Sequence, residues 1–72
     1  MAKIICRDPL KSYSQTIVLS QPVSVQDLPR LLKIPEELAE SIIVVRNHQK
    51  LDLKEFITNE DEIVLFLAVM GG

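Results

Sequence analysis

The hydrophobic and polar positions of the N-terminal part predict two strands joined by a turn. A short apolar run with β-branched residues, Lys3 to Arg7, leads into the turn residues Arg7 to Ser12. A second extended run, Tyr13 to Leu19, follows. Two such runs on either side of a few turn residues are typical of a β-hairpin. We therefore expect the chain to begin with a hairpin.

The next segment changes to helical periodicity. Apolar residues from Val25 to Leu32 recur at the spacing that places side chains on one face of a helix. Ser24 and Asp27 resemble a capping box, in which a hydroxyl and an acidic side chain three residues apart satisfy the first amides of a helix. Pro29 lacks an N–H, so we expect either a distorted first turn or a helix that begins at Asp27.

The helix should end soon after its apolar face. Pro35 disfavours helical angles at Ile34, which places the end of the helix near Lys33. The segment PEELAES, residues 35–41, is expected to add one further helical turn.

The last third of the chain is predicted to be mostly β-structure. Consecutive β-branched residues make Ile42 to Arg46 the clearest strand. We expect a turn at 47–50, with Asn47 in a left-handed conformation, and then a short strand at 50–53. An irregular loop with Phe56 and Ile57 and a polar turn at 58–62 should follow. The final strand is predicted to run from Glu62 to Val69.

This order of elements predicts an α+β fold. A hairpin, a crossing helix and an apolar final strand indicate a β-grasp, with a mixed sheet of four to five strands packed on one helix. We assign residues 1–70 to this domain and residues 71–72 to a flexible Gly-Gly tail.

Composition excludes several classes of function. The 72 residues carry a net charge of −2, with no basic stripe of the kind that nucleic-acid binding needs. Cys6 and His48 are the only residues of their types, which argues against a zinc cluster or a Ser-His-Asp triad. No apolar run approaches the roughly 20 residues that span a bilayer, and no signal peptide is visible. We expect a cytoplasmic protein that binds neither nucleic acid nor membrane.

Four segments of the chain carry a resemblance to a known family: SVQDLPRLL, IIVVRNHQKL, the polar turn NEDE before IVLFLAV, and the terminal GG. Together and in this order they resemble the ThiS/MoaD family of ubiquitin-like sulfur carriers, which serve thiamine and molybdopterin biosynthesis. Members of the family often have Asn-Gly in the turn where this chain has Asn47-His48, and a glycine in the acidic turn. The approach LFLAVM slightly favours the thiamine carriers.

The resemblance implies that the C-terminal carboxylate of Gly72 is the reacting group. A partner enzyme would use ATP to form an acyl-adenylate there, and a sulfur donor would convert it to a thiocarboxylate. The carrier binds no cofactor and is a co-substrate rather than an enzyme. The implied partners are an E1-like adenylyltransferase of the ThiF or MoeB type, a cysteine desulfurase or rhodanese, and an acceptor synthase of the ThiG or MoaE type.

The two glycines of the chain, Gly71 and Gly72, suit this chemistry. Residues without Cβ atoms give the narrowest peptide for threading into a closed site where an acyl-adenylate is protected from water. The alternative for a terminal Gly-Gly is a frayed end or an expression scar.

The final strand also predicts a docking surface, because alternate residues of a strand face opposite sides of its sheet. If Ile63, Leu65 and Leu67 face the helix, the opposite face presents an apolar group that includes the aromatic anchor Phe66. A strand buried on both faces, or a homodimer contact, would explain the same pattern. The predicted partner-binding residues are Ile43, Val45, Val64, Phe66, Ala68 and Met70.

We assign no catalytic or metal-binding role to any side chain. Cys6 is expected to be a small buried hydrophobic residue and His48 a solvated turn residue. Glu60, Asp61 and Glu62 are expected to form a solvated turn or a cap, with some of them meeting basic residues of a partner. Two other functions stay open: a ubiquitin-like modifier joined to target lysines through Gly72, and a β-grasp interaction domain whose tail has no chemistry.

Overall fold

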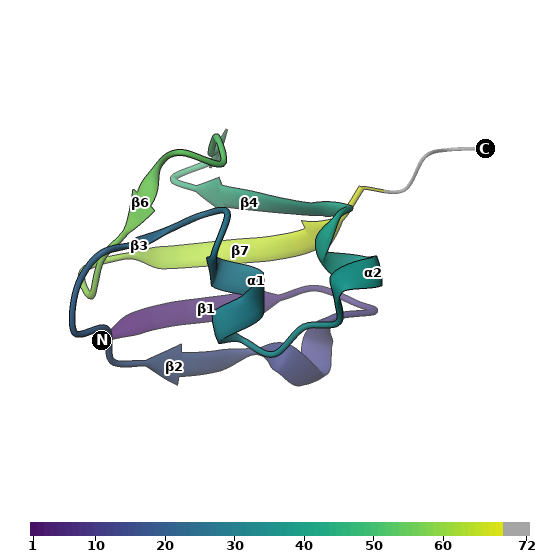
Figure 1. Cartoon of the computed structure of the whole chain (residues 1–72), viewed down its shortest axis with the longest axis horizontal. Helices are drawn as coiled ribbons and strands as arrows, with labels where there is room; N and C mark the ends of the chain where they lie inside the picture. The colour runs from purple at the N-terminus through teal and green to yellow at the C-terminus, as the bar shows by residue number, and fades with distance from the viewer. Residues whose placement is uncertain (69–72) are drawn as a thin grey trace.

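A computed structural model, which describes residues 1–68, contains a five-stranded mixed sheet with two short helices on one face (Figure 1). The strand order is β2-β1-β7-β4-β5. The central strand β7, Glu62–Leu67, runs parallel to β1, Ala2–Cys6, and antiparallel to β4, Ile42–Arg46. This arrangement confirms the predicted α+β class. The predicted domain boundary at residue 70 lies outside the described residues.

The N-terminal hairpin is present, but its second strand is shorter than expected. β2 covers Gln15–Ile17 and pairs antiparallel with β1. Tyr13, where the strand was expected to begin, instead belongs to a 3-10 turn, Lys11–Tyr13, and its amide donates to the Leu10 carbonyl. The amide of Cys6 donates to Ser14 Oγ at 2.8 Å. At this end of the hairpin a side-chain hydrogen bond therefore takes the place of a backbone bond between β1 and β2.

The first helix, α1, covers only Leu28–Leu31, with Asp27 at its N-cap. The Asp27 amide donates to Ser24 Oγ at 3.3 Å, and the Ser24 hydroxyl donates to the Asp27 carboxylate at 3.0 Å. The predicted onset at Asp27 is therefore confirmed. Lys33, with φ at 63°, lies beyond the helix in a left-handed conformation. The further helical turn is also present, as α2, Glu36–Ala39.

A second, two-stranded sheet was not predicted. β3, Val23–Ser24, pairs antiparallel with β6, Phe56–Ile57, which we had placed in an irregular loop. Strands of two residues are too short to show a period of two, and their pairing joins segments far apart in the chain. The side chain of Ile57 is fully buried, whereas that of Phe56 is exposed.

The hairpin of β4 and β5 turns through two residues with positive φ, Asn47 at 54° and His48 at 67°. Such a turn matches the twist of the flanking strands, and it usually carries Asn-Gly. The left-handed Asn47 is confirmed. β5 covers Gln49–Lys50, which is earlier and shorter than the predicted strand at 50–53. The final strand was predicted to run from Glu62 to Val69. In the structure β7 ends at Leu67, and Val69 lies outside the described residues.

The core lies between the sheet and the layer formed by the helices and the small sheet. Ile63 and Leu65 of β7 are fully buried, and Val44 of β4 is nearly so. Ile42 and Leu67 are partly buried and pack against this cluster. The predicted orientation of the final strand is therefore confirmed. The remaining core side chains come from β1, α1, β6 and the segments between elements: Ala2, Ile4, Cys6, Leu10, Leu19, Val25, Leu28, Leu32, Ile34, Leu51 and Ile57.

Candidate functional site

The final strand carries the chain out of the middle of the sheet. β7 is held on both sides, by β1 and by β4. Beyond the strand, the amide of Ala68 donates to the Ser41 carbonyl at 2.7 Å, which fixes the last described residue beside the end of α2 (Figure 1). The predicted tail residues Met70, Gly71 and Gly72 lie outside the described residues. The last described residue therefore follows a strand that lies in the middle of the sheet.

An apolar patch lies on the sheet face opposite the helices. The register places Phe66 opposite Ile43, and Val64 between Val45 of β4 and Ile5 of β1. All of these side chains are partly exposed, as is Ala68. We call this set the sheet-face patch: Ile5, Ile43, Val45, Val64, Phe66 and Ala68. The structure thus brings together the predicted docking residues that it describes.

Ile5 was not among the predicted docking residues. Ile5 lies beside Val64 because β1 pairs in parallel with β7. This pairing joins segments from opposite ends of the sequence, so the sequence alone did not show that the two residues are neighbours. The available signal was the alternation of β1 itself, in which Ile4 and Cys6 are buried and Ile5 faces the other way. Next to the patch, Lys3 and Glu62 form an exposed ion pair at 3.9 Å. Such a pair contributes little to stability and leaves both charges open to a partner.

The acidic turn before β7 differs from the expected solvated turn at one position. Asp61 Oδ2 accepts hydrogen bonds from the Thr58 amide at 2.7 Å and from Arg46 Nη1 at 3.1 Å. Its side chain is only 16% exposed. Arg46 Nη1 also donates to the Phe56 carbonyl at 3.0 Å, so this ion pair ties β4 to β6 and to the turn. Asp61 is therefore a structural residue, whereas Glu60 and Glu62 are exposed.

The lone cysteine is buried in the core. Burial raises the pKa of the Cys6 thiol, while a hydrogen bond with Ser14 acts in the opposite direction. A thiol with a raised pKa is a weak nucleophile at neutral pH. His48 is exposed in its turn. Within residues 1–68, no group of three or more His, Cys, Asp or Glu side chains is placed to hold a metal ion, and no helix is long and apolar enough to cross a membrane.

A β-grasp sheet of this strand order, with Gly71-Gly72 following the central strand in the sequence, is typical of ubiquitin-like proteins. A comparison with protein-family models matches the ThiS family over residues 6–72. The chain therefore belongs to the ThiS family, and its role is that of a ubiquitin-like sulfur carrier rather than a catalyst. A comparison with curated proteins finds no match.

Proposed function

We propose that Gly72 is adenylated by an ATP-dependent partner and converted to a thiocarboxylate for sulfur transfer. The carboxylate attacks the α-phosphorus of ATP and releases pyrophosphate. The terminal sulfur of a persulfide then attacks the acyl carbon and expels AMP, which gives an acyl disulfide with the donor. A thiol attacks the donor's sulfur of that S–S bond, forms a disulfide with the donor and releases the thiocarboxylate. The protein binds no cofactor of its own in this scheme; the adenylate and the thiocarboxylate are covalent states of its C-terminus.

The observation that supports this proposal is the position of the two glycines in the sequence, Gly71 and Gly72. The structure has three residues with positive φ within residues 1–68, and none of them is glycine: Lys33, Asn47 and His48. Glycine would adopt these angles without steric cost. Both glycines of the chain are instead the two terminal residues that follow β7 and the segment 68–70. This use of glycine fits a tail that must pass through a narrow channel, since the folded body manages its tight turns without it.

The sheet-face patch supplies a docking surface for this scheme. Its strands present an apolar area on a small protein, and such areas commonly bind partners. Phe66 is the proposed anchor, because it is the aromatic member of the patch and lies two residues before Ala68. Met70, two residues after Ala68 in the sequence, is proposed to contact the partner as well. Docking here would position the tail for entry into the partner's active site.

We propose an E1-like adenylyltransferase of the ThiF type as the activating partner. A cysteine desulfurase or rhodanese would supply the sulfur, and a synthase of the ThiG type would accept it in thiamine biosynthesis. The apolar segment LFLAVM before the glycines slightly favours this pathway over molybdopterin synthesis. We place the reaction in the cytoplasm, where ATP and these enzymes would act together.

The intact mass of the protein tests the proposal. After incubation with the adenylyltransferase, ATP and a sulfur donor, we expect one oxygen of the C-terminus to be replaced by sulfur. Deleting Gly72 should abolish this change and leave the fold intact, as judged by NMR spectra of both proteins. A truncated protein that is still activated would refute the role of Gly72. Covalent attachment to other proteins would instead identify a modifier.

A further inference from the structure

The strand β2 lies at one end of the strand order and has a single neighbour. It pairs with β1 and with no other strand of residues 1–68. Figure 1 shows β2 along the lower edge of the sheet, with no strand beyond it. Thr16 in the middle of β2 is exposed, and so is Val18, which follows the strand. The sheet is therefore open along β2.

The backbone groups of Thr16 point out of the sheet at this edge. Thr16 stands opposite Lys3 in the antiparallel ladder of β1 and β2. The Lys3 amide donates to the Asp61 carbonyl at 3.0 Å, which lies on the β7 side of β1. Two opposite residues of such a ladder either exchange their backbone bonds or both direct them away. Thr16 therefore directs its N–H and C=O away from β1.

The extended conformation continues beyond β2, because an asparagine side chain takes the place of β1 as its partner. Asn59 Oδ1 accepts from the Leu19 amide at 2.7 Å, and Asn59 Nδ2 donates to the Leu19 carbonyl at 2.7 Å. Exposure alternates in step, since Val18 is 73% exposed and Leu19 is buried. Val18 therefore continues the outer row that begins with Thr16. Within residues 1–68, neither Thr16 nor Val18 has a backbone partner on this side.

Two large apolar side chains stand uncovered at the same edge. Continued by one residue, the register that pairs Ala2 with Ile17 places Met1 opposite Val18. Met1 is 74% exposed, and it and Val18 are the two most exposed large hydrophobic residues of the described chain. A strand added along β2 would cover Val18 and pair the free backbone groups.

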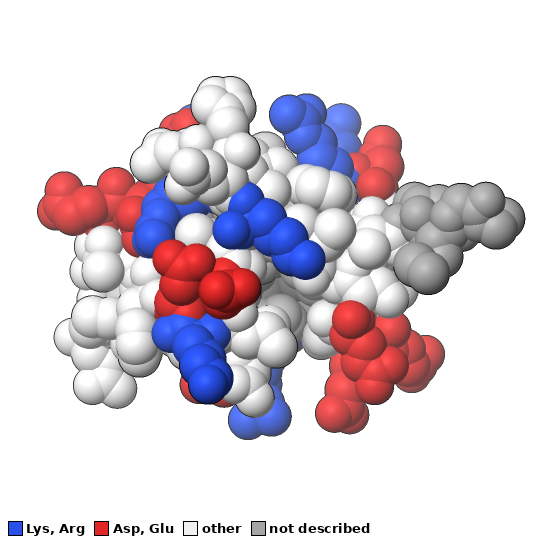
Figure 2. Space-filling view, turned by 90° about the horizontal axis from the view of Figure 1, so that it is seen from above, with Lys and Arg blue, Asp and Glu red and all other residues white. Residues whose placement is uncertain are grey.

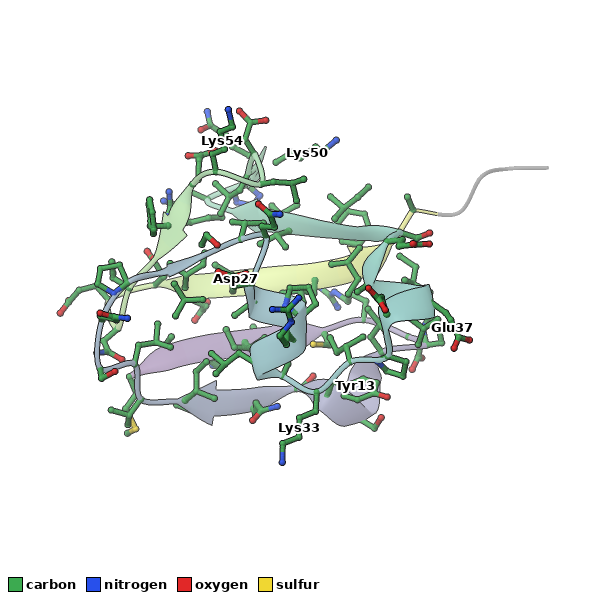
Figure 3. All side chains as sticks on the ribbon, in the orientation of Figure 1. Tyr13, Asp27, Lys33, Glu37, Lys50 and Lys54 are labelled. Atoms are coloured by element: carbon green, nitrogen blue, oxygen red, sulfur yellow. The ribbon has the colours of Figure 1, made fainter. Side chains whose placement is uncertain are left out.

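The charge pattern favours a second copy of the chain as the added strand. Residues 12–26 contain no Lys, Arg, Asp or Glu, so two identical segments can meet here without like charges within them. The opposite side of the molecule differs, because charged side chains of both signs are spread over it (Figure 2), with Lys50 and Lys54 labelled there in Figure 3. Such charges protect a sheet edge from pairing, and β2 has none of its own.

One lysine from another part of the fold projects past this edge. Figure 3 shows Lys33 extending beyond β2 from the layer in front of the sheet. Two copies joined here would each bring this cation toward the joint. The repulsion is screened by salt, so added salt should strengthen the association rather than weaken it.

We propose that two copies of the chain pair antiparallel through β2, with Ile17 opposite Ile17 of the second copy. Thr16 of each copy then exchanges both backbone bonds with Val18 of the other. The two Ile17 side chains, each partly buried against its own core, meet on the helix side of the sheet. The two five-stranded sheets become one continuous sheet. The same segment serves both copies, as a two-fold contact requires.

This dimer leaves both docking surfaces and both chain ends free. Its two-fold axis is perpendicular to the sheet, so the two sheet-face patches lie on one face. Because the joined β2 strands are antiparallel, the β7 strands of the two copies run in opposite directions and point to opposite ends of the joined sheet. Each copy can then present its C-terminus to a separate enzyme. The dimer does not depend on the proposed sulfur chemistry.

Sedimentation equilibrium of the intact chain tests the association. A contact through one short strand is far below the size of a stable interface, so we expect a dissociation constant on the order of 0.1–1 mM. Between about 20 μM and about 1 mM protein, the average mass should rise by about 1.5-fold. Over the same range, exchange of the Thr16 and Val18 amides should slow by about twofold or more. The Ile17 amide, which faces β1, should not change and is the internal reference.

A matched pair of variants locates the contact. Val18→Lys places a charge on the open edge and should raise the dissociation constant by about tenfold or more. Leu53→Lys introduces the same charge at a leucine outside this edge that is 61% exposed, and should change the constant by less than about twofold. Both side chains are largely exposed, so both variants should keep the fold. Adenylation of Val18→Lys should match that of the unchanged chain.

Several outcomes would overturn the dimer. An average mass that stays at one chain up to about 1 mM would refute it. Equal weakening by Val18→Lys and Leu53→Lys would show that the contact lies elsewhere, and so would a dimer that Phe66→Asp breaks and Val18→Lys does not. Association that weakens with added salt would point to ion pairs and contradict the uncharged joint. Protection of Thr16 and Val18 by an added adenylyltransferase, in a carrier that stays monomeric, would assign the edge to that partner instead.

Discussion

Removing the carboxylate of Asp61 should destabilise the protein far more than removing its acidic neighbours. In Asp61→Ala, the partly buried Thr58 amide loses an acceptor at 2.7 Å, and Arg46 loses one at 3.1 Å. A hydrogen bond to a charged acceptor contributes about 2 kcal/mol. The ion pair adds up to about 1 kcal/mol, because Arg46 is partly exposed and keeps its bond to Phe56. We expect a total loss of about 3 kcal/mol.

Urea unfolding measures this loss. For a small domain the free energy of unfolding changes by about 1–3 kcal/mol per molar urea, so the midpoint of Asp61→Ala should fall by at least about 1 M. Asp61→Asn keeps one acceptor oxygen and should lose about half as much. Glu60→Ala removes an exposed acid from the same turn and is the matched control, with a change within about 0.5 kcal/mol. Equal shifts for Asp61→Ala and Glu60→Ala would refute the structural role of Asp61.

Three further predictions concern the docking patch, the β4–β5 turn and the buried thiol. Phe66→Asp should weaken binding to the adenylyltransferase by about tenfold in a titration. Phe56→Asp makes the same change at an exposed phenylalanine of β6 and should leave the affinity unchanged. Equal effects of the two variants would count against docking at the sheet-face patch. His48→Gly should raise the free energy of unfolding by about 0.5–1 kcal/mol, because glycine adopts the positive φ of 67° without strain; a lower urea midpoint would contradict this. The raised pKa of Cys6 means that the unfolded thiol ionises first, so stability should fall as pH rises past the ordinary thiol pKa of about 8.5. Cys6→Ala should flatten that fall, and an unchanged slope would show that other groups cause it.

The β4–β5 turn shows how a local rule survives a change of residue. The resemblance to the family places Asn-Gly at this turn, and the chain has Asn47-His48 instead. Both residues nevertheless have positive φ, and the two strands pair at Val45 with Lys50 and Arg46 with Gln49. The two-residue connection and the twist of the strands impose this geometry, whichever side chain follows the asparagine.

The sequence by itself determined the elements whose signal is local. Apolar and β-branched runs predicted β4 and β7. The period of two in a strand grouped Ile63 with Leu65, and the structure places this group in the core. Pro29 indicated Asp27 as one of two possible starts of the first helix, and Asp27 is the N-cap of α1. The terminal Gly-Gly and the order of segments were enough to predict the fold and the family. Each of these rests on residues within one turn or one strand of each other, or on their order along the chain.

Only the tertiary structure decided the contacts that join distant segments. The pairing of β3 with β6, the ion pair of Arg46 with Asp61 and the place of Ile5 beside Val64 all depend on how segments far apart in sequence are brought together. A pattern of apolar residues states which face a strand buries, because that is a property of the strand alone. Which neighbour it meets, and where that neighbour stops, is decided by the packing of the whole chain.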